Sequence, residues 1–390
     1  MTLFDPSILR LPFYEERHHA LAADLEAWVE RHRQLPHEHR ALDVEEKGRV
    51  YTRLLGEAGW LRHAVEADSG RQRPDVRSLC LIREALAFLD DLLDFAFSIQ
   101  GLAAAPLAWY GSPEQRACVI PAMREGRSIG ALALSESESG SNLAALKSQA
   151  VREGAGYVLD GTKTWISNGP IADHHAVLAR TGEGPGGLGL SFLWVPASTS
   201  GLRTERIDLL APRAFSSLHF SQCLLPATAL IGEPGKGFIY ATEILDLYRV
   251  SVGAAALGFC RRAMRCATDW SRQRNVAGSK LIQTQFTIEK LSGMSLHLDT
   301  TALLVARAAW EFDTGVRDVA AHASMAKLHA TDGASRVVDD VVQLFGAAGL
   351  VADSEPEQLF RQIRALRIYE GTSEIQKMII AGAVSRPPSR

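Results

Sequence analysis

The sequence has few cysteines, and none of them are arranged to bind a metal. The five, at positions 80, 118, 223, 260 and 266, are odd in number, widely scattered and without a C-x-x-C pair. We therefore expect neither a disulfide framework nor a zinc site. The triplet His37-Glu38-His39 follows Pro36, and no second group of ligands accompanies it, which favours a surface loop and no bound metal.

An excess of charge of one sign is also lacking. The 42 Lys and Arg residues nearly balance the 45 Asp and Glu residues, so the formal net charge is −3, with no field to attract nucleic acid or an anionic membrane. The start of the chain has no basic region followed by an apolar one, and Asp5 and Glu15 argue against a transit peptide. No apolar run approaches the length that spans a bilayer. We expect a cytoplasmic protein without a nucleic-acid or membrane partner.

The length of 390 residues predicts two or three packed domains. Apolar residues first recur at helical spacing, then short β-like segments appear between turn residues, and helical spacing returns to the end. This order predicts a multi-domain α+β protein with a helical domain at 1–125, a β domain at 126–232 and a helical domain at 233–390.

Two features of the first domain mark its helices. The apolar stretch 78–105, bounded by Pro74 and Pro106, predicts one buried helix or a broken pair. Ser112 precedes Pro113 and lies three residues before Gln115, which predicts the capped start of another helix.

The middle segment carries strand and turn signals. Asp160-Gly161 lies between apolar residues and predicts a tight hairpin, while 176–179 and 190–195 predict further strands. Residues 182–187 formally match G-x-G-x-x-G, the dinucleotide-binding pattern. That pattern must open a helix, whereas here it runs directly into a strand, so we expect a flexible hairpin loop.

A long motif near the end of the chain indicates chemistry. Glu370 is followed directly by Gly371, which could leave the backbone open to a ligand, and Thr372 could start a helix. An ordinary helix cap with surface acids explains these residues equally well. The string from Arg364 to Gln376, R-A-L-R-I-Y-E-G-T-S-E-I-Q, nevertheless resembles the catalytic segment of the acyl-CoA dehydrogenases, which implies that Glu370 is a proton-abstracting base.

Two further segments resemble the flavin-binding part of this family. Residues 130–142 are similar to its flavin-cradling strand and loop, and Lys163 to Gly169 are similar to its K-x-W-I-T-N motif. The resemblance implies that Trp165 forms a wall of the flavin site and that Ser135 and Ser167 supply hydroxyl groups. Without the family, Trp165 is more simply explained as a core residue.

The helices after the β domain carry the remaining similarity. The resemblance implies that Arg249 lies beside the substrate and that Asp246 contacts it on the coenzyme A side; an ion pair on a helix is the plainer explanation of such residues. Residues 343–349 resemble a turn that approaches the FAD of a neighbouring subunit. The implied cofactor-binding residues are Leu132, Leu134, Ser135, Ser141, Trp165, Ser167, Arg274, Gln285, Gln343, Gly346, Thr372 and Glu374. The implied substrate-binding residues are Ser141, Asp246, Arg249 and Gly371.

Four departures from the family pattern concern the substrate class and not the fold. Ser135-Glu136-Ser137 replaces T-E-P, Asn142 replaces Asp, Ala277 replaces the Phe of R-x-x-F-G, and Ser221-Gln222 replaces an acidic pair. The loss of an aromatic ring at Ala277 could loosen FAD or open space beside it.

The resemblance implies the acyl-CoA dehydrogenase fold: an all-α N-terminal domain, a small central β-barrel or β-sandwich, and a C-terminal domain like a four-helix bundle. It implies FAD-dependent α,β-dehydrogenation of an acyl-CoA or an acyl-carrier thioester, electron transfer to an electron-transfer flavoprotein, and a homotetramer. Burial beside an apolar ligand should raise the pKa of Glu370 from its ordinary value of about 4.3 to about 6 or 7. Tyr248, where other branches have an acid, favours Glu370 as the base. An oxidase or monooxygenase on the same scaffold is the alternative, and a non-catalytic flavoprotein is the second.

Overall fold

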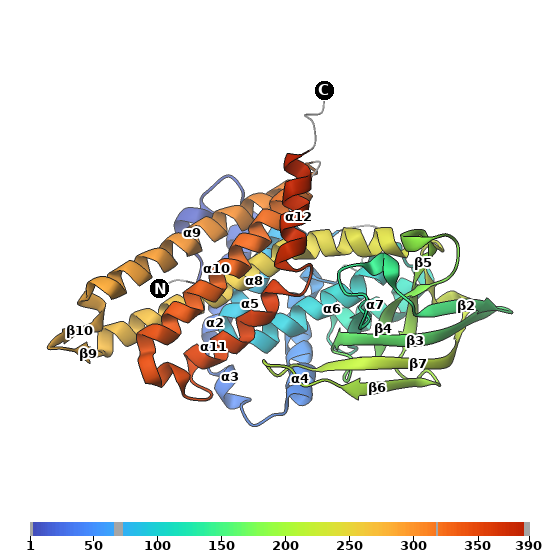
Figure 1. The fold of residues 1–390 in the computed structure, drawn as a ribbon, viewed down its shortest axis with the longest axis horizontal. Helices are drawn as coiled ribbons and strands as arrows, with labels where there is room; N and C mark the ends of the chain where they lie inside the picture. The colour runs from blue at the N-terminus through green and yellow to red at the C-terminus, as the bar shows by residue number, and fades with distance from the viewer. Residues whose placement is uncertain (1–2, 66–72, 317–318, 386–390) are drawn as a thin grey trace. The chain divides into compact units, whose positions relative to one another are not determined.

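The computed structural model describes residues 3–65, 73–316 and 319–385. Its architecture is the expected one, helical at the start and end of the sequence with a central β region (Figure 1). The chain divides into two compact units. Unit 1 comprises residues 1–37, 75–91 and 246–390, and unit 2 comprises 38–74 and 92–245.

Unit 2 contains one eight-stranded sheet. Its strands are β1 (Gly130–Ala133), β2 (Gln149–Glu153), β3 (Gly156–Ser167), β4 (His174–Arg180), β5 (Leu190–Pro196), β6 (Leu202–Arg206), β7 (Phe215–Pro226) and β8 (Leu230–Ile231). They lie in the order β6-β7-β3-β2-β4-β5-β8, with β1 parallel to β4 (Figure 1). The strands predicted at 176–179 and 190–195 are confirmed as β4 and β5.

The predicted hairpin at Asp160-Gly161 is wrong, because β3 runs unbroken through these residues. Gly161 has a φ of 137° and lies at a register shift against β7, where β7 contributes the extra residue of a bulge, so the chain does not turn here. A Cβ at this position would lie 2.4 Å from the Ser148 Oγ, which explains the glycine by close approach. The hairpin instead closes at Gly154-Ala155, where Glu153 pairs with Gly156.

The glycine-rich segment 182–187 does lead into a strand. A short 3₁₀ turn (Gly186–Gly189) joins it directly to β5, and no helix begins there. The positive φ angles of Gly182 and Gly186 suit a loop. The segment therefore has the loop-to-strand structure that the sequence predicted.

The helices of the first 125 residues are α1 (Pro6–Leu9), α2 (Glu16–Arg31), α3 (Leu35–Glu38), α4 (Val44–Glu57), α5 (Val76–Leu89), α6 (Asp91–Tyr110) and α7 (Pro113–Arg124). The stretch 78–105 is a broken pair, interrupted at Asp90. Pro106 lies inside α6 and does not bound it, contrary to our expectation. The Ser112 side chain accepts from the Gln115 amide, so the predicted cap of α7 is confirmed.

One helix overturns the expectation that no apolar run is long enough to span a bilayer. Among the described residues, α6 has 20 residues, and an 18-residue window within it has a mean hydropathy of 1.3, so this helix is long and apolar enough to cross a membrane. Its apolar window is 89% buried within the protein, as in the core helix of a folded domain. An apolar helix whose surface is already covered by protein has no need of lipid contact.

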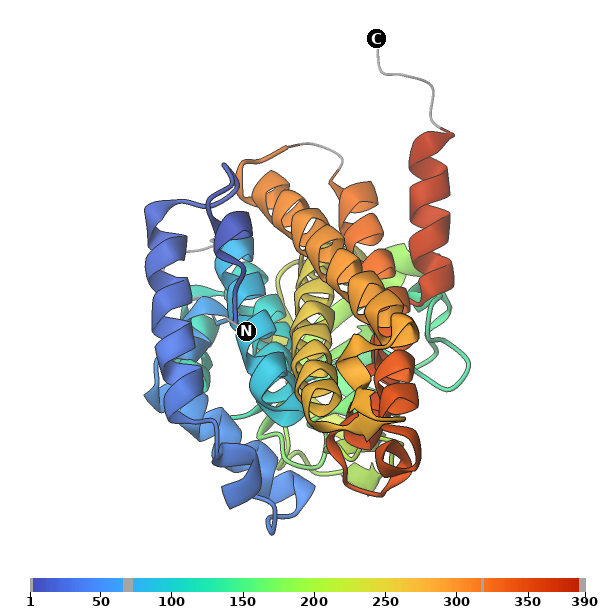
Figure 2. The ribbon, with the colours of Figure 1, turned by 90° about the vertical axis from the view of Figure 1, so that its left-hand side faces the viewer.

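The second half of unit 1 is helical. Its elements are α8 (Gly237–Gln273), which begins within the sequence of unit 2, then α9 (Gln285–Asp313), α10 (Ala320–Phe345), α11 (Glu355–Ile363) and α12 (Ser373–Val384). Helix α10 packs against α9, α11 and α12, and Figure 2 shows the long helices α9 and α10 side by side. Small buried residues such as Ala256, Ala302 and Ala330 share one apolar core and permit this close packing.

Candidate functional site

In unit 1 the turn before α12 presents Glu370. Glu370 and Gly371 both have left-handed backbone angles, with φ of 52° and 90°. The Thr372 hydroxyl then accepts from the Ile375 amide and caps α12, which confirms the predicted helix start. Glu370 is partly buried, whereas Glu374 is exposed. A left-handed non-glycine residue is strained, and such strain concentrates at functional sites.

Two buried side chains hold the carbonyl group of Gly371. The Lys327 Nζ of α10 donates to this oxygen at 2.7 Å, and the Gln376 Nε2 donates to it at 2.9 Å. The Gln376 amide also lies 3.3 Å from the Glu370 carbonyl oxygen. Lys327 and Gln376 are both completely buried. The conformation of the Glu370-Gly371 turn is therefore fixed from the interior of the protein.

The segment next to this turn is anchored to α10 by a charged residue. The Asp332 Oδ1 accepts from the Arg367 Nε at 2.7 Å and from the Ser373 hydroxyl at 2.8 Å. Because Arg367 precedes Glu370 and Ser373 follows it, one carboxylate ties down both sides of the turn. The backbone around Glu370 has little freedom to move.

On α8, Asp246 and Arg249 form a pair one helical turn apart. The Arg249 Nη1 donates to the Asp246 Oδ1 at 2.7 Å, so the ion pair considered from the sequence exists. Arg249 is only 6% exposed, and among the described residues its Nε has no hydrogen-bond partner. A buried guanidinium with an unused donor can bind a carbonyl or anionic group of a ligand.

The charges in this part of unit 1 act on one another. Burial lowers the pKa of Lys327 to about 8, against the attraction of Glu370, which raises it. Arg249 lowers this pKa further, and the other charges that act on it are Asp332 and Arg367. The Glu370 carboxylate therefore shares a largely buried environment with two cations from different helices.

In unit 2 the two flavin-type motifs are joined. The Thr164 amide donates to the Ser135 carbonyl oxygen at 3.0 Å, next to Trp165. The Lys163 Nζ donates to the Leu134 carbonyl oxygen at 3.0 Å and to the Glu136 Oε1 at 2.9 Å. The loop after β1 is thereby fixed to the middle of β3.

The Trp165 side chain is 49% exposed, so the alternative explanation of Trp165 as a core residue is wrong. It has a φ of 57° and lies at a bulge where the register of β3 against β7 shifts. Ile166 is buried while Trp165 and Ser167 are accessible, so the indole and the Ser167 hydroxyl belong to the same accessible side of the strand. An open aromatic face beside hydroxyl groups can take a flat cofactor ring.

The remaining unit 2 residues lie along the same loop. Leu132 is in β1, and Leu134 follows it, 8% exposed. Ser141 and Asn142 are exposed in the loop that leads to β2. The Asn142 backbone carbonyl accepts from the Ser139 hydroxyl, so the loop is held without the side chain that replaces the usual Asp.

The far end of unit 1 gathers four of the predicted cofactor residues at the surface. These are Arg274, Gln285, Gln343 and Gly346, all exposed. Trp270 connects Arg274 with the segment that holds Gln343 and Gly346: its Nε1 donates to the Leu344 carbonyl oxygen at 3.1 Å, its ring stacks on Phe345 with centroids 4.3 Å apart, and the Arg274 guanidinium lies 5.9 Å from the ring centroid. The structure thus brings the two sequence segments together.

Ala277 lies at the tip of the small hairpin formed by β9 (Asn275–Val276) and β10 (Ser279–Lys280). Ala277 and Gly278 have φ of 48° and 87°, the pattern of a two-residue type I′ turn. Ala277 is exposed, so its small side chain leaves open space at this surface and no cavity within the chain.

Sequence reasoning gave no role to the two buried lysines, Lys163 and Lys327. A lysine is almost never fully buried unless it has a partner. Lys327 sits in an alanine-rich apolar stretch of α10, and this contrast was the available signal. The contacts of Lys327 are formed with residues more than forty positions away and are invisible in the sequence.

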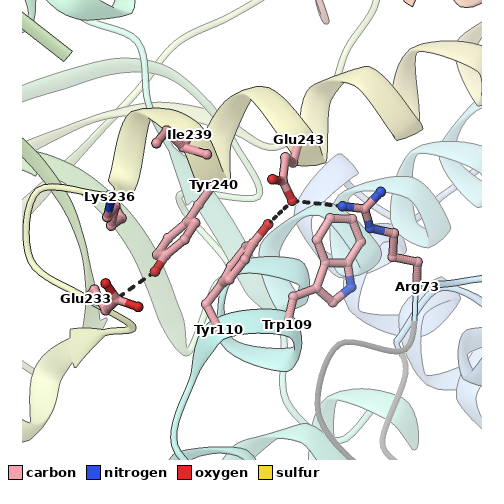
Figure 3. A pocket seen from close by; sticks show the side chains of 8 residues that line it. All are labelled: Arg73, Trp109, Tyr110, Glu233, Lys236, Ile239, Tyr240 and Glu243. Atoms are coloured by element: carbon pink, nitrogen blue, oxygen red, sulfur yellow. Dashed lines mark hydrogen bonds and ion pairs between the residues drawn. The ribbon is translucent and has the colours of Figure 1, made fainter. Parts of the chain in front are cut away.

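A cavity of about 330 Å³ in unit 2 contains none of the predicted site residues. The rings of Tyr110 and Tyr240 stack with their centroids 3.7 Å apart, and Glu243 accepts hydrogen bonds from the Tyr110 hydroxyl and from Arg73 (Figure 3). Trp109, Glu233, Lys236 and Ile239 complete its lining. Of its charged side chains, Arg73 and Glu243 form an ion pair with each other.

Comparison with known proteins gives matches along nearly the whole chain. Three family models match: "Acyl-CoA dehydrogenase, N-terminal domain" over residues 15–127, "middle domain" over 131–223 and "C-terminal domain" over 235–385. The short-chain specific acyl-CoA dehydrogenase of Mus musculus is 36% identical over 288 residues, covering 73% of this chain and 70% of that protein. The cyclohexane-1-carbonyl-CoA dehydrogenase of Geobacter metallireducens is 34% identical, covering 80% and 82%.

Solved structures share the fold. A chain from a study of the electron transferring flavoprotein of Acidaminococcus fermentans has a TM-score of 0.85 and 28% identity, covering 96% of this chain and 99% of that one. A glutaryl-CoA dehydrogenase of Mycobacterium smegmatis in complex with FADH2 has a TM-score of 0.86 and 25% identity, covering 99% and 98%.

Proposed function

The chain belongs to the acyl-CoA dehydrogenase family of FAD-dependent oxidoreductases acting on CH–CH bonds, and on this premise we propose that Glu370 is its catalytic base. The observation that carries the proposal is the left-handed Glu370-Gly371 turn, fixed by Lys327, Gln376 and Asp332. An ordinary helix cap needs no such support, because Thr372 alone caps α12.

The residues of unit 2 fit the flavin ring of FAD. Trp165 keeps half of its surface exposed on a strand with a positive φ, a costly arrangement that an aromatic ligand would repay. Ser167 follows Trp165 by two residues in the chain. The Ser135 carbonyl oxygen accepts a hydrogen bond from the amide of Thr164, the residue before Trp165. We propose that these residues, with Leu132, Leu134 and Ser141, hold the flavin, which supplies the acceptor for the β hydride.

The chemistry assigned to the chain itself is proton removal at the α carbon. That step builds negative charge on the thioester carbonyl oxygen, which must be stabilised by donors positioned in advance. The backbone N–H of Glu370 is the donor that we assign, because the turn is held rigidly from beneath. A rigid donor needs no reorganisation when the charge develops.

We propose that the substrate is an acyl-CoA whose pantetheine arm or carbonyl groups meet Arg249, Asp246 and Gly371. The buried Nε of Arg249, which has no hydrogen-bond partner in the part of the chain that the structure describes, supports a polar ligand at this position. The curated relatives are named for short-chain and cyclic acyl-CoA substrates. A small acyl group is therefore the first choice, with an acyl-carrier thioester as the alternative donor.

The test is anaerobic flavin reduction in the purified holoenzyme. A panel of short-chain and cyclic acyl-CoAs should include one that bleaches the flavin absorbance. Glu370→Gln should slow this bleaching by roughly 100-fold or more while retaining the flavin. Bleaching at the parent rate in this variant would remove Glu370 from its role. Rapid reoxidation by air with product still bound would favour an oxidase.

We further propose a homotetramer that passes electrons to an electron-transfer flavoprotein. Helix α9 exposes three large apolar side chains, Phe286, Ile288 and Leu296, at 54%, 52% and 66%, and a second copy would cover them. The exposed positions of Arg274, Gln285 and Gln343 suit contact with a cofactor held by another subunit. Light scattering tests the tetramer, and electron transfer to a purified flavoprotein partner tests the second proposal.

We also propose a cytoplasmic location. All five cysteines are free thiols, which suits a reducing compartment.

A further inference from the structure

Lys327 is a fully buried cation whose hydrogen bond goes to a backbone carbonyl group. Its Nζ lies 2.7 Å from the Gly371 carbonyl oxygen, and its exposed fraction is 0%. Burying an ammonium group is strongly unfavourable unless it is paired with an opposite charge and hydrogen-bonded. Apolar packing alone would be served better by a methionine or leucine in this helix of small residues. The position of the charge therefore needs a functional explanation.

The group that Lys327 holds is the strained part of the turn. Glu370 has a φ of 52°, a region that non-glycine residues rarely adopt, and Gly371 has a φ of 90°. Such angles persist only when the surroundings determine them. The Gly371 carbonyl oxygen receives two donors, from Lys327 and from Gln376, which fix the orientation of the peptide that follows Glu370.

We propose that Lys327 is a positioning residue for Glu370: its ammonium group holds the Glu370-Gly371 turn through the Gly371 carbonyl and keeps Glu370 in its carboxylate form. This inference rests on the proposed role of Glu370 as the base. Lys327 itself touches neither the proton nor the thioester in this account. It acts through the backbone and through its charge.

The electrostatics of the surroundings support the second part of the proposal. The charged groups that act on Lys327 are Glu370 and Asp332, which favour its charged form, and Arg249 and Arg367, which oppose it. Attraction between two charges is reciprocal, so the Lys327 ammonium favours an ionised Glu370. A base must be ionised before the substrate arrives, and substrate binding would otherwise desolvate and neutralise it.

Three substitutions separate the hydrogen bond from the charge. Lys327→Met removes both, Lys327→Gln keeps a donor without the charge, and Lys327→Arg keeps the charge and donors. The matched control is Thr331→Val, one turn along the same helix, where a buried hydroxyl bonds the Lys327 carbonyl at 2.9 Å and carries no charge. The rate of anaerobic flavin reduction is measured in each holoenzyme from pH 6 to 9, over a range of acyl-CoA concentrations.

The proposal expects the acid limb of the rate profile to move up by about one pH unit in Lys327→Met and Lys327→Gln. Lys327→Arg and Thr331→Val should keep the parent limb. The limiting rate above the limb should fall roughly 10-fold or more in Lys327→Met and much less in Lys327→Gln, with little change in KM, because the base is misplaced while the substrate site is intact.

The proposal is overturned if the acid limb of Lys327→Gln coincides with that of Lys327→Arg, or if Thr331→Val shifts it equally. These two variants decide the matter even if Lys327→Met fails to fold, since both keep a donor and differ in charge. Glu370→Gln distinguishes a failure of the proposed function from a failure of the positioning role of Lys327. If that variant reduces its flavin at the parent rate, the proposed function fails; if it is slow while the Lys327 variants resemble the parent, only the positioning role fails.

Discussion

The buried pair of Glu136 and Lys163 in unit 2 allows a quantitative prediction about stability. The Glu136 carboxylate accepts from the amides of Lys147 and Ser148 and from the Lys163 ammonium. Against burial, which raises it, the charge of Lys163 and these hydrogen bonds lower the pKa of Glu136 from 4.5 to about 2. Burial lowers the pKa of Lys163 from 10.5 to about 8, despite the attraction of Glu136.

These shifts set opposite contributions to the free energy of unfolding. Each is about 2.5 pH units, or roughly 3 kcal/mol. The Glu136 contribution stabilises the fold above about pH 4.5 and is lost as the pH falls towards 2. The Lys163 contribution destabilises the fold below about pH 8 and disappears as the pH rises towards 10.5. Near pH 7 the two contributions therefore nearly cancel, and the intact pair has little net effect on the free energy of unfolding.

Breaking the pair is a different matter, because one charge then stays buried alone. Lys163→Met should destabilise unit 2 by about 3 kcal/mol or more at pH 7. Hydrogen exchange of β3 peptides, followed by mass spectrometry, should then speed up by roughly 100-fold. The loss should shrink as the pH falls and Glu136 is protonated, and the double variant Glu136→Gln/Lys163→Met should recover most of it.

A clear result against this reasoning is available. If Lys163→Met accelerates exchange less than about 10-fold, or if the double variant is no more protected than the single one, the pair is not a buried charge system as described. Thr162→Ala, at an exposed neighbouring position of β3, is the control and should leave exchange nearly unchanged.

Three further substitutions probe backbone features. Gly371→Ala places a Cβ 2.6 Å from the Gln376 amide at a φ of 90°, so flavin reduction should slow at least 10-fold with the flavin retained; a parent-like rate would show that the turn tolerates movement. Gly161→Ala puts a Cβ 2.4 Å from the Ser148 hydroxyl at a φ of 137° and should lower the thermal midpoint by several degrees; an unchanged midpoint would contradict the bulge. Ser112→Ala removes a helix cap and should cost about 1 kcal/mol in urea unfolding; no loss would mean that Gln115 caps α7 alone.

Local signals in the sequence determined most of the fold. Ser112, Pro113 and Gln115 specify a helix start through bonds within one turn, and the capped helix appears as predicted. The run at 190–195 becomes β5 because its composition suits a buried strand. The hairpin predicted at Asp160-Gly161 was wrong because of a tertiary contact. A glycine suits a hairpin turn, but here its lack of a side chain avoids a clash with Ser148 next to a bulge.

The sequence by itself singled out the residues that we propose to carry chemistry, since Glu370, Gly371 and Trp165 stand in long motifs that resemble those of the family. Only the tertiary structure decided what supports them. Lys327 meets Gly371 across 44 positions, and Lys163 meets Glu136 across 27, contacts that no local pattern encodes. The physical reason is that the free energy of a buried charge depends on its three-dimensional surroundings, and those exist only after the helices and strands have packed.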